Sequence, residues 1–532
     1  MAQPQLLEGQ SGLPVDNPTK SYWHKEPSNK LLGHRTTKEL PRTADVVIVG
    51  SGITGSFAAH FLKEKQPDLN VVMVEAREAC SGATGRNGGH CQPAIYASEP
   101  HIASFELRNF LYLKSLIEEF SIPCDWRSTS GVHAFYSRKL FKNCRAIVDD
   151  LAEHYPDLAA NVAVVTKGKK GEGDLSGSPA YLIEGERREL TLDGLRIPHA
   201  EGAIVQWNAA SLWPYKLVAF VLERLLAANE GSKGSFNLQT NTPVTGLSRA
   251  ETSANLSSPG GTKTPQHNSI WTVHTPRGTI ATSQVLLATN GYTSHLLPQF
   301  SDLLVPTRGQ ISALKPPETP TDPTDPPLDI AHTYYIVGEP VDPYARDDYL
   351  VQRPPPTAEL IFGGGRQHAK GRGMGVWDDS SIDEPVSWYL RGELSNAIDL
   401  SLHHTHTHAP SEDHKPPLRK LDLEPTFEWS GIMGYTRDAH PWVGPVPPSL
   451  GGGPGLWLCA GYTGHGMPNA VLSARAAVDM LLAGDGDDTV EIDLPPEYEL
   501  TEQRVRDARR EEEVGVADAK GSLYMDFGPQ RG

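Results

Sequence analysis

The stretch DVVIVGSGITGSFAAHFLKEKQPDLNVVMVE, at residues 45–75, decides the fold of this chain. Its opening run, Asp45–Val49, is rich in valine and isoleucine, which predicts a parallel strand buried on both faces. The next residues, Gly50–Gly55, fit the pattern G-x-G-x-x-G. Apolar residues then recur at helical spacing and predict a helix over Ser56–Lys65.

Each part of this unit suits the binding of a dinucleotide. Gly50 permits a tight turn, Gly52 lets a pyrophosphate approach the backbone, and Gly55 lets the helix pack closely on the sheet. The phosphates are expected at the helix N-terminus, where unpaired N–H groups and the helix dipole favour anions. A second predicted strand, Val71–Val74, ends at Glu75. The carboxylate there can accept hydrogen bonds from ribose hydroxyls and would repel a 2′-phosphate, so NADP is disfavoured.

Composition limits the class of protein. The chain has 532 residues, enough for two or three domains. Its net charge of −17 argues against partners that are nucleic acids or anionic membranes. The first twenty residues show no secretory signal, and no apolar run is long enough to cross a membrane. The five cysteines form no C-x-x-C, which indicates free thiols in a reducing compartment, and we expect a cytoplasmic protein.

Three further glycine-rich segments are candidate cofactor contacts. Ser81–His90 leaves the strand that carries Glu75, and the apolar strand in Val285–Tyr292 runs directly into Ala-Thr-Asn-Gly. Gly461–Pro468 lies between a predicted strand, Leu456–Ala460, and a predicted helix over 469–482. The N-terminus of that helix offers a positive dipole end to an anion.

Other elements and inserts can be assigned from their patterns. The remaining predictions are helices at 101–122 and 144–160, a hairpin at 270–281, and consecutive antiparallel strands at 334–337, 348–352 and 359–363. Loops are predicted at 167–178, 251–269 and 316–327. Five histidines within Leu402–His414 suggest a metal site, but their spacing matches no fixed zinc pattern, and we expect a solvated loop without metal.

Several segments taken together resemble one family, the FAD-dependent D-amino-acid oxidase and glycine oxidase superfamily. They are GSGITG at 50–55 with Glu75, SGATGRNGG at 81–89, LLATNGY at 286–292, VPTRGQ at 305–310, YLVQRP…LIFGGGR at 349–366 and GYTGHGM at 461–467. Within the superfamily the chain is most similar to gamma-glutamylputrescine oxidoreductase and its fungal relatives. The resemblance covers roughly residues 40–485.

The resemblance implies FAD as the cofactor. It assigns the first glycines to the pyrophosphate, Glu75 to the adenosine ribose, Val244 to the adenine, residues 84–88 to the flavin half and residues 464–467 to the flavin pyrimidine edge. The implied cofactor-binding residues are Gly50, Ser51, Gly52, Ile53, Thr54, Gly55, Glu75, Ala76, Arg77, Ser81, Thr84, Gly85, Arg86, Asn87, Gly88, Val244, Thr289, Asn290, Gly291, Gly434, Gly464, His465, Gly466 and Met467. Cys459, His90 and Cys91 stand in other contexts than the residues that tether FAD in some relatives, so we expect non-covalent FAD.

The implied activity is removal of a hydride from a C–H next to an amine onto the flavin, with electrons passing to O2 or another acceptor. The partner is then a small amine or amino acid. Candidate substrate-side residues are Arg308, Gln310, Tyr334, Tyr335, Arg366, Trp429 and Met433. Either arginine could clamp a carboxylate bidentately or form a structural ion pair instead. For Tyr334, Trp429 and Met433 the alternative is core packing.

The implied fold is α/β, or α+β overall, with an FAD-binding Rossmann-like domain and a mixed, largely antiparallel sheet in the substrate domain. The expected segments are an N-terminal arm at 1–43, the FAD-binding domain at 44–100, 190–300 and 425–485, the substrate domain at 101–189 and 301–424, and a C-terminal tail at 486–532. We expect Trp23, Leu31 and Leu32 to lay the arm over the FAD-binding domain, and a helix to begin the tail near 501.

Two other functions stay open at this point. One is a non-catalytic FAD protein with a scaffold or trafficking role, which the proline-rich and histidine-rich inserts favour. The other is a flavin monooxygenase, which would need NAD(P)H, and the sequence shows no second G-x-G-x-x-G to bind it.

Overall fold

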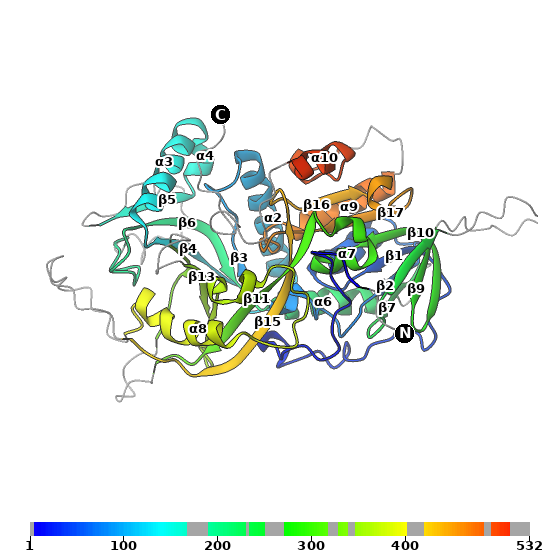
Figure 1. Ribbon diagram of the computed structural model, residues 1–532, viewed down its shortest axis with the longest axis horizontal. Helices are drawn as coiled ribbons and strands as arrows, with labels where there is room; N and C mark the ends of the chain where they lie inside the picture. The colour runs from blue at the N-terminus through cyan, green and yellow to red at the C-terminus, as the bar shows by residue number, and fades with distance from the viewer. Residues whose placement is uncertain are drawn as a thin grey trace, which may run out of the picture.

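Two β-sheets organise the part of the chain that the computed structural model describes (Figure 1). The described residues are 5–167, 190–229, 234–249, 271–317, 328–338, 346–401, 420–483 and 491–510. The first sheet contains β1 (Thr43–Val49), β2 (Val71–Val74), β7 (Phe236–Gln239), β8 (Gly246–Arg249), β9 (Trp271–Thr275), β10 (Gly278–Leu287), β16 (Trp442–Pro445) and β17 (Leu456–Ala460).

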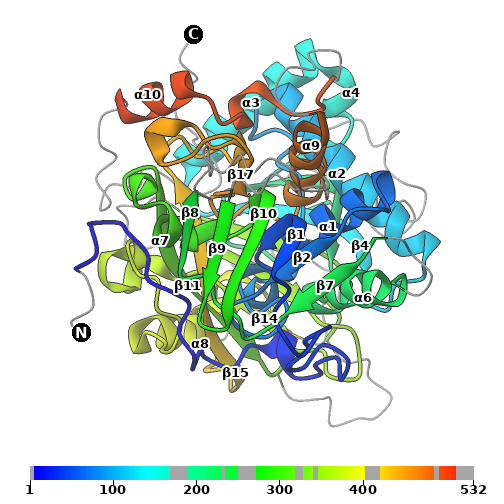
Figure 2. The ribbon, with the colours of Figure 1, turned by 90° about the vertical axis from the view of Figure 1, so that its right-hand side faces the viewer.

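The centre of the first sheet is parallel. Its neighbouring strands follow the order β16-β17-β10-β1-β2-β7, and the pairs from β17 to β7 are parallel. Figure 2 shows β9, β10, β1, β2 and β7 side by side in this order. The antiparallel strands β16, β8 and β9 are added at the β17 and β10 side. The Rossmann-like sheet that the sequence predicts is therefore confirmed.

The second sheet is mostly antiparallel, as predicted. It contains β3 (His90–Cys91), β4 (Arg127–Phe135), β5 (Val162–Thr166), β6 (Gly202–Ser211), β11 (Leu304–Leu314), β12 (Thr333–Val337), β13 (Asp347–Gln352), β14 (Leu360–Gly363) and β15 (Pro425–Thr436). Its order is β15-β11-β14-β13-β12-β4-β6-β3, with β5 beside β6, and only β12 and β4 run parallel among these described strands.

Helices cover the sheets. They are α1 (Ile53–Lys65), α2 (Pro100–Glu119), α3 (Arg138–His154), α4 (Pro156–Ala159), α6 (Pro214–Ala227), α7 (Thr293–Leu296), α8 (Glu384–Ala397), α9 (Ala470–Ala483) and α10 (Glu502–Arg510). Helix α1 packs between α6 and α9. Val46 and Ile48 of β1 share an apolar cluster with these helices, while Val47 and Val49 lie in a separate cluster with Trp271 of β9. Burial on both faces explains the unbroken apolar run of β1.

Most predicted elements are confirmed with shifted ends. Helix α1 begins at Ile53, earlier than predicted, because Gly52 is already its N-cap residue. The predicted helix at 144–160 is wrong in its limits, since α3 ends at His154 and α4 starts afresh at Pro156, a residue suited to a first helical position. The predicted hairpin is confirmed in β9 and β10, and β10 continues into the buried strand at 285–287.

Three strands connect segments that the sequence assigns to different domains. β6 lies within 190–300, β15 within 425–485 and β3 within 44–100, yet each pairs in the second sheet. The ladders between β6 and β4, and between β15 and β11, fix this placement. The second sheet therefore contains strands from segments that the sequence assigns to the FAD-binding domain as well as from those assigned to the substrate domain.

The N-terminal arm packs against the first sheet and the loops that follow it. Trp23 and Leu31 are buried as predicted, whereas Leu32 is 50% exposed and was wrongly assigned to this contact. Helix α10 occupies the predicted start of the tail. The predicted loops at 251–269 and at Leu402–His414 lie outside the described residues, as do residues 168–178 and 318–327 of the other two.

Two further observations bear on the expected environment. The five cysteines are buried free thiols, as the sequence predicts. None of the helices in the described ranges combines the length and the hydropathy needed to cross a membrane.

Candidate active site

A cavity of about 300 Å³ lies where the carboxyl ends of the parallel strands face the second sheet. Val49 and Val74, at the ends of β1 and β2, line one side, and Tyr335 and Met433, from β12 and β15, line the other. In open α/β sheets, ligands bind at the carboxyl ends of the strands. The cavity therefore occupies the place that the dinucleotide-binding unit predicts.

The glycine-rich turn after β1 has the geometry that its sequence indicates. Gly50 has a φ of +107°, and a Cβ there would lie 2.6 Å from the carbonyl oxygen of Ala288. A Cβ on Gly55 would lie 2.0 Å from the carbonyl oxygen of Gly50, so only a glycine at this position lets the helix pack this closely against the turn. At Gly52 the nearest atom would be Oγ1 of Thr84, at 3.1 Å. Gly52 thus leaves a cradle that a side chain would fill.

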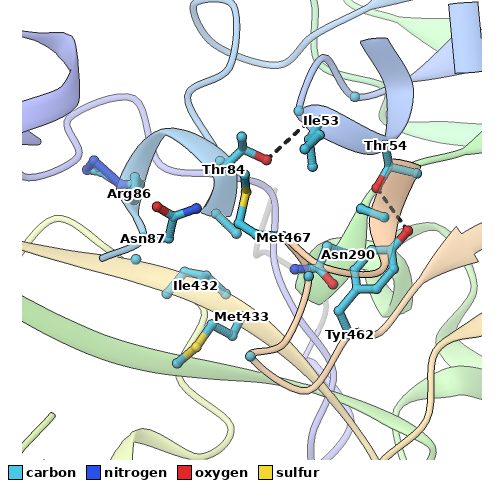
Figure 3. Close-up of a pocket in the computed structure, with 18 of the residues that line it drawn as sticks. Ile53, Thr54, Thr84, Arg86, Asn87, Asn290, Ile432, Met433, Tyr462 and Met467 are labelled. Atoms are coloured by element: carbon cyan, nitrogen blue, oxygen red, sulfur yellow. Dashed lines mark hydrogen bonds between the residues drawn. The ribbon is translucent and has the colours of Figure 1, made fainter. Parts of the chain in front are cut away.

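Two hydrogen bonds join the first turn of α1 to neighbouring loops (Figure 3). The backbone N–H of Ile53 donates to Oγ1 of Thr84 at 3.0 Å, and the hydroxyls of Thr54 and Tyr462 lie 2.9 Å apart. The Tyr462 hydroxyl also lies 3.2 Å from the sulfur of Cys459. Burial raises the pKa of the Cys459 thiol to about 12, so this thiol is neutral.

The Glu75 carboxylate is held at the cavity wall by three donors. Its Oε2 accepts from the backbone N–H and the hydroxyl of Ser51, at 3.0 and 2.7 Å. Its Oε1 accepts from the backbone N–H of Arg77 at 3.0 Å. Each carboxylate oxygen can accept more than one hydrogen bond, so Oε1 keeps capacity for a hydroxyl group of a ligand.

A buried ion cluster lies behind the same wall. The Arg77 guanidinium lies 2.9 Å from Oδ1 of Asp379, and Nε of Arg86 lies 3.0 Å from Oδ2. Arg86 also donates to the carbonyl oxygen of Thr19 in the N-terminal arm. Figure 3 shows the Arg86 side chain directed away from Met467. Burial lowers the pKa of Arg86 to about 10, and the nearby Asp379 partly offsets this effect.

Helix α2 anchors the glycine-rich turn before α9. The Glu106 carboxylate lies 3.0 Å from Nε2 of His465 and accepts from the side-chain amide of Asn469 at 3.0 Å. The amide of Asn109 donates to the carbonyl oxygen of Met467 at 3.1 Å. Burial alone would raise the pKa of Glu106, but His465 and the hydrogen-bond donors lower it overall. The turn is therefore fixed from outside the cavity.

The part of the cavity next to β3 and β4, called the β3–β4 end below, carries neutral histidines. Nε2 of His133 lies 2.6 Å from the side-chain nitrogen of Gln92, and its Nδ1 lies 2.6 Å from the hydroxyl of Tyr96. Burial lowers the pKa of His133 to about 3 and that of His90 to about 4. Both imidazoles are therefore uncharged near neutral pH.

Tyrosine rings complete this end. The ring of Tyr349 sits between two glycines, because a Cβ on Gly88 or on Gly363 would lie 2.2 or 2.3 Å from its atoms. The same ring meets the imidazole of His90 edge-on, at 5.5 Å between centroids. Tyr335 packs edge-on against His133 at 5.7 Å. This part of the cavity wall is thus aromatic, and its two imidazoles carry no charge.

The carboxyl group of Asp348 lies next to this part of the cavity and is held in its protonated form. The Tyr389 hydroxyl donates to its Oδ2 at 2.5 Å, and the backbone N–H of Gly365 donates to Oδ1 at 2.9 Å. Burial, and then the neighbouring Asp347, raise the pKa of Asp348 to about 8. A raised folded-state pKa stabilises the fold fully below the ordinary value of 3.8, and this contribution is lost as the pH rises through about 8.

We therefore expect Asp348→Asn to remove part of the pH dependence of stability. The free energy of unfolding of the wild type should fall relative to that of the variant as the pH rises from 3.8 to about 8. In this range the carboxyl group of Asp348 releases a proton when the protein unfolds, whereas the amide of the variant has no proton to release. Urea denaturation of both proteins across this range measures the difference. Parallel curves would show that the carboxyl group titrates normally.

The comparison with known families decides the identity of the fold. The model of the DAO family, FAD dependent oxidoreductase, matches residues 45–480. The chain belongs to this family. No curated protein matches the chain.

Solved structures share the fold of this FAD dependent oxidoreductase. Glycine oxidase from Geobacillus kaustophilus has a TM-score of 0.58 and 18% identity, over 87% of this chain and 99% of that one. L-amino acid deaminase from Proteus vulgaris, without its specific insertion sequence, has a TM-score of 0.57 and 17% identity, over 90% and 99%. L-proline dehydrogenase from P. horikoshii has a TM-score of 0.56 and 17% identity, over 84% and 96%.

Most residues that the resemblance assigns to FAD line the one cavity. They are Gly50, Ser51, Gly52, Ile53, Thr54, Glu75, Ala76, Arg77, Thr84, Arg86, Asn87, Gly88, Val244, Thr289, Asn290, Gly464, His465, Gly466 and Met467. The open cradle at Gly52 and the carboxylate of Glu75 fit the pyrophosphate and the ribose of FAD. The donor and acceptor set of the described residues therefore suits the cofactor that the family implies.

The other five assigned residues, Gly55, Ser81, Gly85, Gly291 and Gly434, do not line the cavity. Close packing explains three of these glycines. A Cβ on Gly85 or on Gly291 would lie 2.1 or 2.5 Å from a backbone carbonyl oxygen, and one on Gly434 would lie 2.7 Å from the Asn290 side chain. These three positions therefore need glycine because the backbone packs closely there, outside the cavity lining.

The structure brings only part of the predicted substrate-side set to the cavity. Tyr334, Tyr335 and Met433 line it, whereas Arg308, Gln310, Arg366 and Trp429 do not. Trp429 is fully buried and donates to the carbonyl oxygen of Arg86 at 2.8 Å. Gln310 bonds to Ser387 on α8 at 2.8 Å. Packing and local hydrogen bonding therefore account for these two residues.

Both arginines form the ion pairs that were the alternative to substrate binding. The Arg308 guanidinium lies 2.9 Å from Asp383, and Nε of Arg366 lies 3.5 Å from Asp347. Strand alternation explains the placement of Arg308, because Gly309 and Ile311 of β11 line the cavity, and the alternate residues Arg308 and Gln310 therefore face the other side. Neither guanidinium reaches the cavity wall as the carboxylate clamp that the sequence suggested.

Several lining residues had no signal in the sequence, namely Leu13, Pro14, Gln92, His133, Gly431 and Ile432. His90 and Tyr462 lie in the glycine-rich segments 81–90 and 461–468, and Tyr349 lies in the family motif at 349–366, but none of the three was assigned a role of its own. Gln92 and His133 meet because β3 and β4 both pair with β6, which no local pattern reveals.

Proposed function

We propose that this chain oxidises the C–N bond of a small amine or amino acid to an imine, with FAD as the cofactor. One observation carries the proposal. A single cavity is lined both by the dinucleotide turn at Gly50–Thr54 and by His90, His133 and Tyr349 of the second sheet. Such a wall beside a dinucleotide site is where a small substrate would meet the cofactor.

Bound there, FAD supplies a two-electron acceptor for the hydride that leaves the carbon next to nitrogen, and O2 or another acceptor then takes the electrons. The chain itself orients the substrate and excludes water. His90 and His133 line the β3–β4 end of the cavity, and burial holds both imidazoles in their uncharged forms. A neutral amine needs no strong base, and neutral imidazoles suit that form.

Finer parts of the assignment remain predictions. These are the likeness to gamma-glutamylputrescine oxidoreductase, non-covalent FAD, the choice between O2 and another acceptor, and a cytoplasmic location. Non-covalent binding is supported by Cys459, which is buried behind Tyr462 and does not line the cavity. Polar and aromatic groups of the second sheet line the same cavity, which disfavours the alternative of a non-catalytic FAD protein, because a structural cofactor would not need them.

Anaerobic mixing of the holoprotein with a panel of amines and amino acids tests the proposal. At least one member should bleach the flavin absorbance, because the amine delivers two electrons that have no other acceptor. The control is the same protein mixed with NADH, which should leave the spectrum unchanged. A flavin that no amine bleaches would support the scaffold role, and one that NADH bleaches would support a monooxygenase.

A further inference from the structure

We propose that the substrate is an amine that carries no carboxylate where it meets the β3–β4 end of the cavity, and that amines are therefore preferred over the corresponding amino acids. This inference rests on the proposed function and narrows its substrate class. It follows from the charges that the described residues present to the cavity.

Guanidinium groups line the cavity only on the dinucleotide side, as far as the described ranges show. Arg77 and Arg86 are the lining arginines, and no lysine is among the lining residues. Both arginines are paired with the fully buried Asp379. Arg86 also donates to the carbonyl oxygen of Thr19, so the guanidinium groups of both arginines are engaged by the chain itself and do not hold a substrate carboxylate.

Two further cationic side chains near the cavity have carboxylate partners. Arg366 pairs with Asp347 and lies over the ring of Tyr435, at 5.4 Å from its centroid. Nε2 of His465 lies 3.0 Å from the buried carboxylate of Glu106. Neither pair offers an excess positive charge to a ligand.

The remaining polar groups at the β3–β4 end are neutral. Burial holds His90 and His133 in their uncharged forms, with pKa values of about 4 and about 3. Gln92 and the tyrosine rings carry no charge. A carboxylate placed here would lose its hydration without gaining a counter-ion, which is strongly unfavourable.

The same surroundings suit an amine. The rings of Tyr335 and Tyr349 offer apolar contacts to the carbon atoms of the substrate, and the side-chain oxygen of Gln92 can accept from the N–H of a neutral amine. Met433 presents an apolar side chain from β15, with its sulfur 3.9 Å from the hydroxyl of Tyr435. The body of the substrate next to it is therefore expected to be apolar.

Matched substrate pairs test this inference on the holoprotein. Each pair is an amino acid and the amine made by its decarboxylation, such as phenylalanine with phenethylamine, ornithine with putrescine and proline with pyrrolidine. The measurement is the second-order rate constant of anaerobic flavin reduction. The best amine should exceed its amino acid by at least ~100-fold, since a buried charge without a partner is discriminated strongly.

The outcomes separate the inference from the proposed function. An amino acid that reduces the flavin as fast as its amine, or faster, overturns the inference and leaves the oxidation of C–N bonds standing. Failure of every amine and every amino acid, in protein shown to hold FAD, overturns both. Reduction by amines alone supports both.

A gain-of-charge variant provides a second test. Met433→Arg should raise the ratio of amino acid to amine by at least ~10-fold, because a guanidinium on β15 would face the cavity and pair with the carboxylate. Met433→Leu is the matched control, and its ratio of amino acid to amine should stay as low as that of the wild type. A rise in the ratio for both variants would show that size, and not charge, controls the choice, and would overturn the inference.

Discussion

Gly52→Val is expected to abolish FAD binding while most of the fold persists. Gly52 has extended backbone angles, φ −67° and ψ −174°, that valine can adopt without strain. Its Cβ would lie 3.1 Å from Oγ1 of Thr84, and the branches would fill the cradle where the pyrophosphate is expected. We expect the FAD content to fall to below ~10% of wild type, because the valine side chain would occupy the space that the pyrophosphate needs at this turn.

The FAD released from purified protein, together with the circular dichroism spectrum, measures both effects. Gly246→Val is the matched control. Gly246 lies on β8 outside the cavity, and a Cβ there would meet no atom within 4 Å, so FAD content should be unchanged. Normal FAD content in Gly52→Val would show that the turn does not hold the cofactor.

Gly466→Asp is expected to slow flavin reduction more than it weakens the binding of oxidised FAD. The side chain fits, because a Cβ on Gly466 would lie in ordinary contact with Tyr462 at 3.5 Å. The family likeness places the flavin pyrimidine edge at this turn, where negative charge builds up on reduction. Loss of one preorganised donor costs about 10²–10³ in rate in other enzymes, and we expect an added like charge to cost at least as much.

Gly466→Asn separates charge from bulk, because its side chain has the same shape without the carboxylate. Stopped-flow reduction and a dye-linked potential should show a lower potential and a slower rate for the aspartate variant than for the asparagine variant. If both variants lose FAD and retain the wild-type potential when reconstituted, the turn is a structural contact and does not face the flavin.

The dinucleotide half of the site could be predicted because its signals are local. The strand, the turn and the helix that hold Gly50 and Gly52 are continuous in sequence, and Glu75 follows at the end of the next strand. Such a unit determines its own geometry once the strand is buried on both faces. The predicted contacts at Thr84 and His465 rested instead on the family likeness, and both residues line the cavity.

The substrate half could not be predicted in the same way. Arg308 was chosen for its chemistry, but its side chain faces Asp383, which is distant in sequence, and Gly309 next to it lines the cavity instead. Which face of a strand is turned inward depends on register, and a shift of one residue exchanges the faces. Gln92 and His133 form a pair only because two strands meet β6.

The N-terminal arm shows a third limit of sequence patterns. The contact of Trp23 with the domain was predicted, whereas the approach of Leu13 and Pro14 to the cavity has no local signal. The arm is held by side-chain contacts to distant loops, such as Arg86 to the carbonyl oxygen of Thr19 and Trp213 to that of Trp23. Contacts of this kind follow from tertiary packing alone.

The identity of the released cofactor tests the central claim most directly. Wild-type protein, purified without added flavin and then denatured, should release FAD at close to one equivalent per chain and no FMN, because Gly52 and Glu75 are placed for the adenosine half of the molecule. A colourless protein that cannot be reconstituted with FAD, or one that releases FMN, would contradict the account.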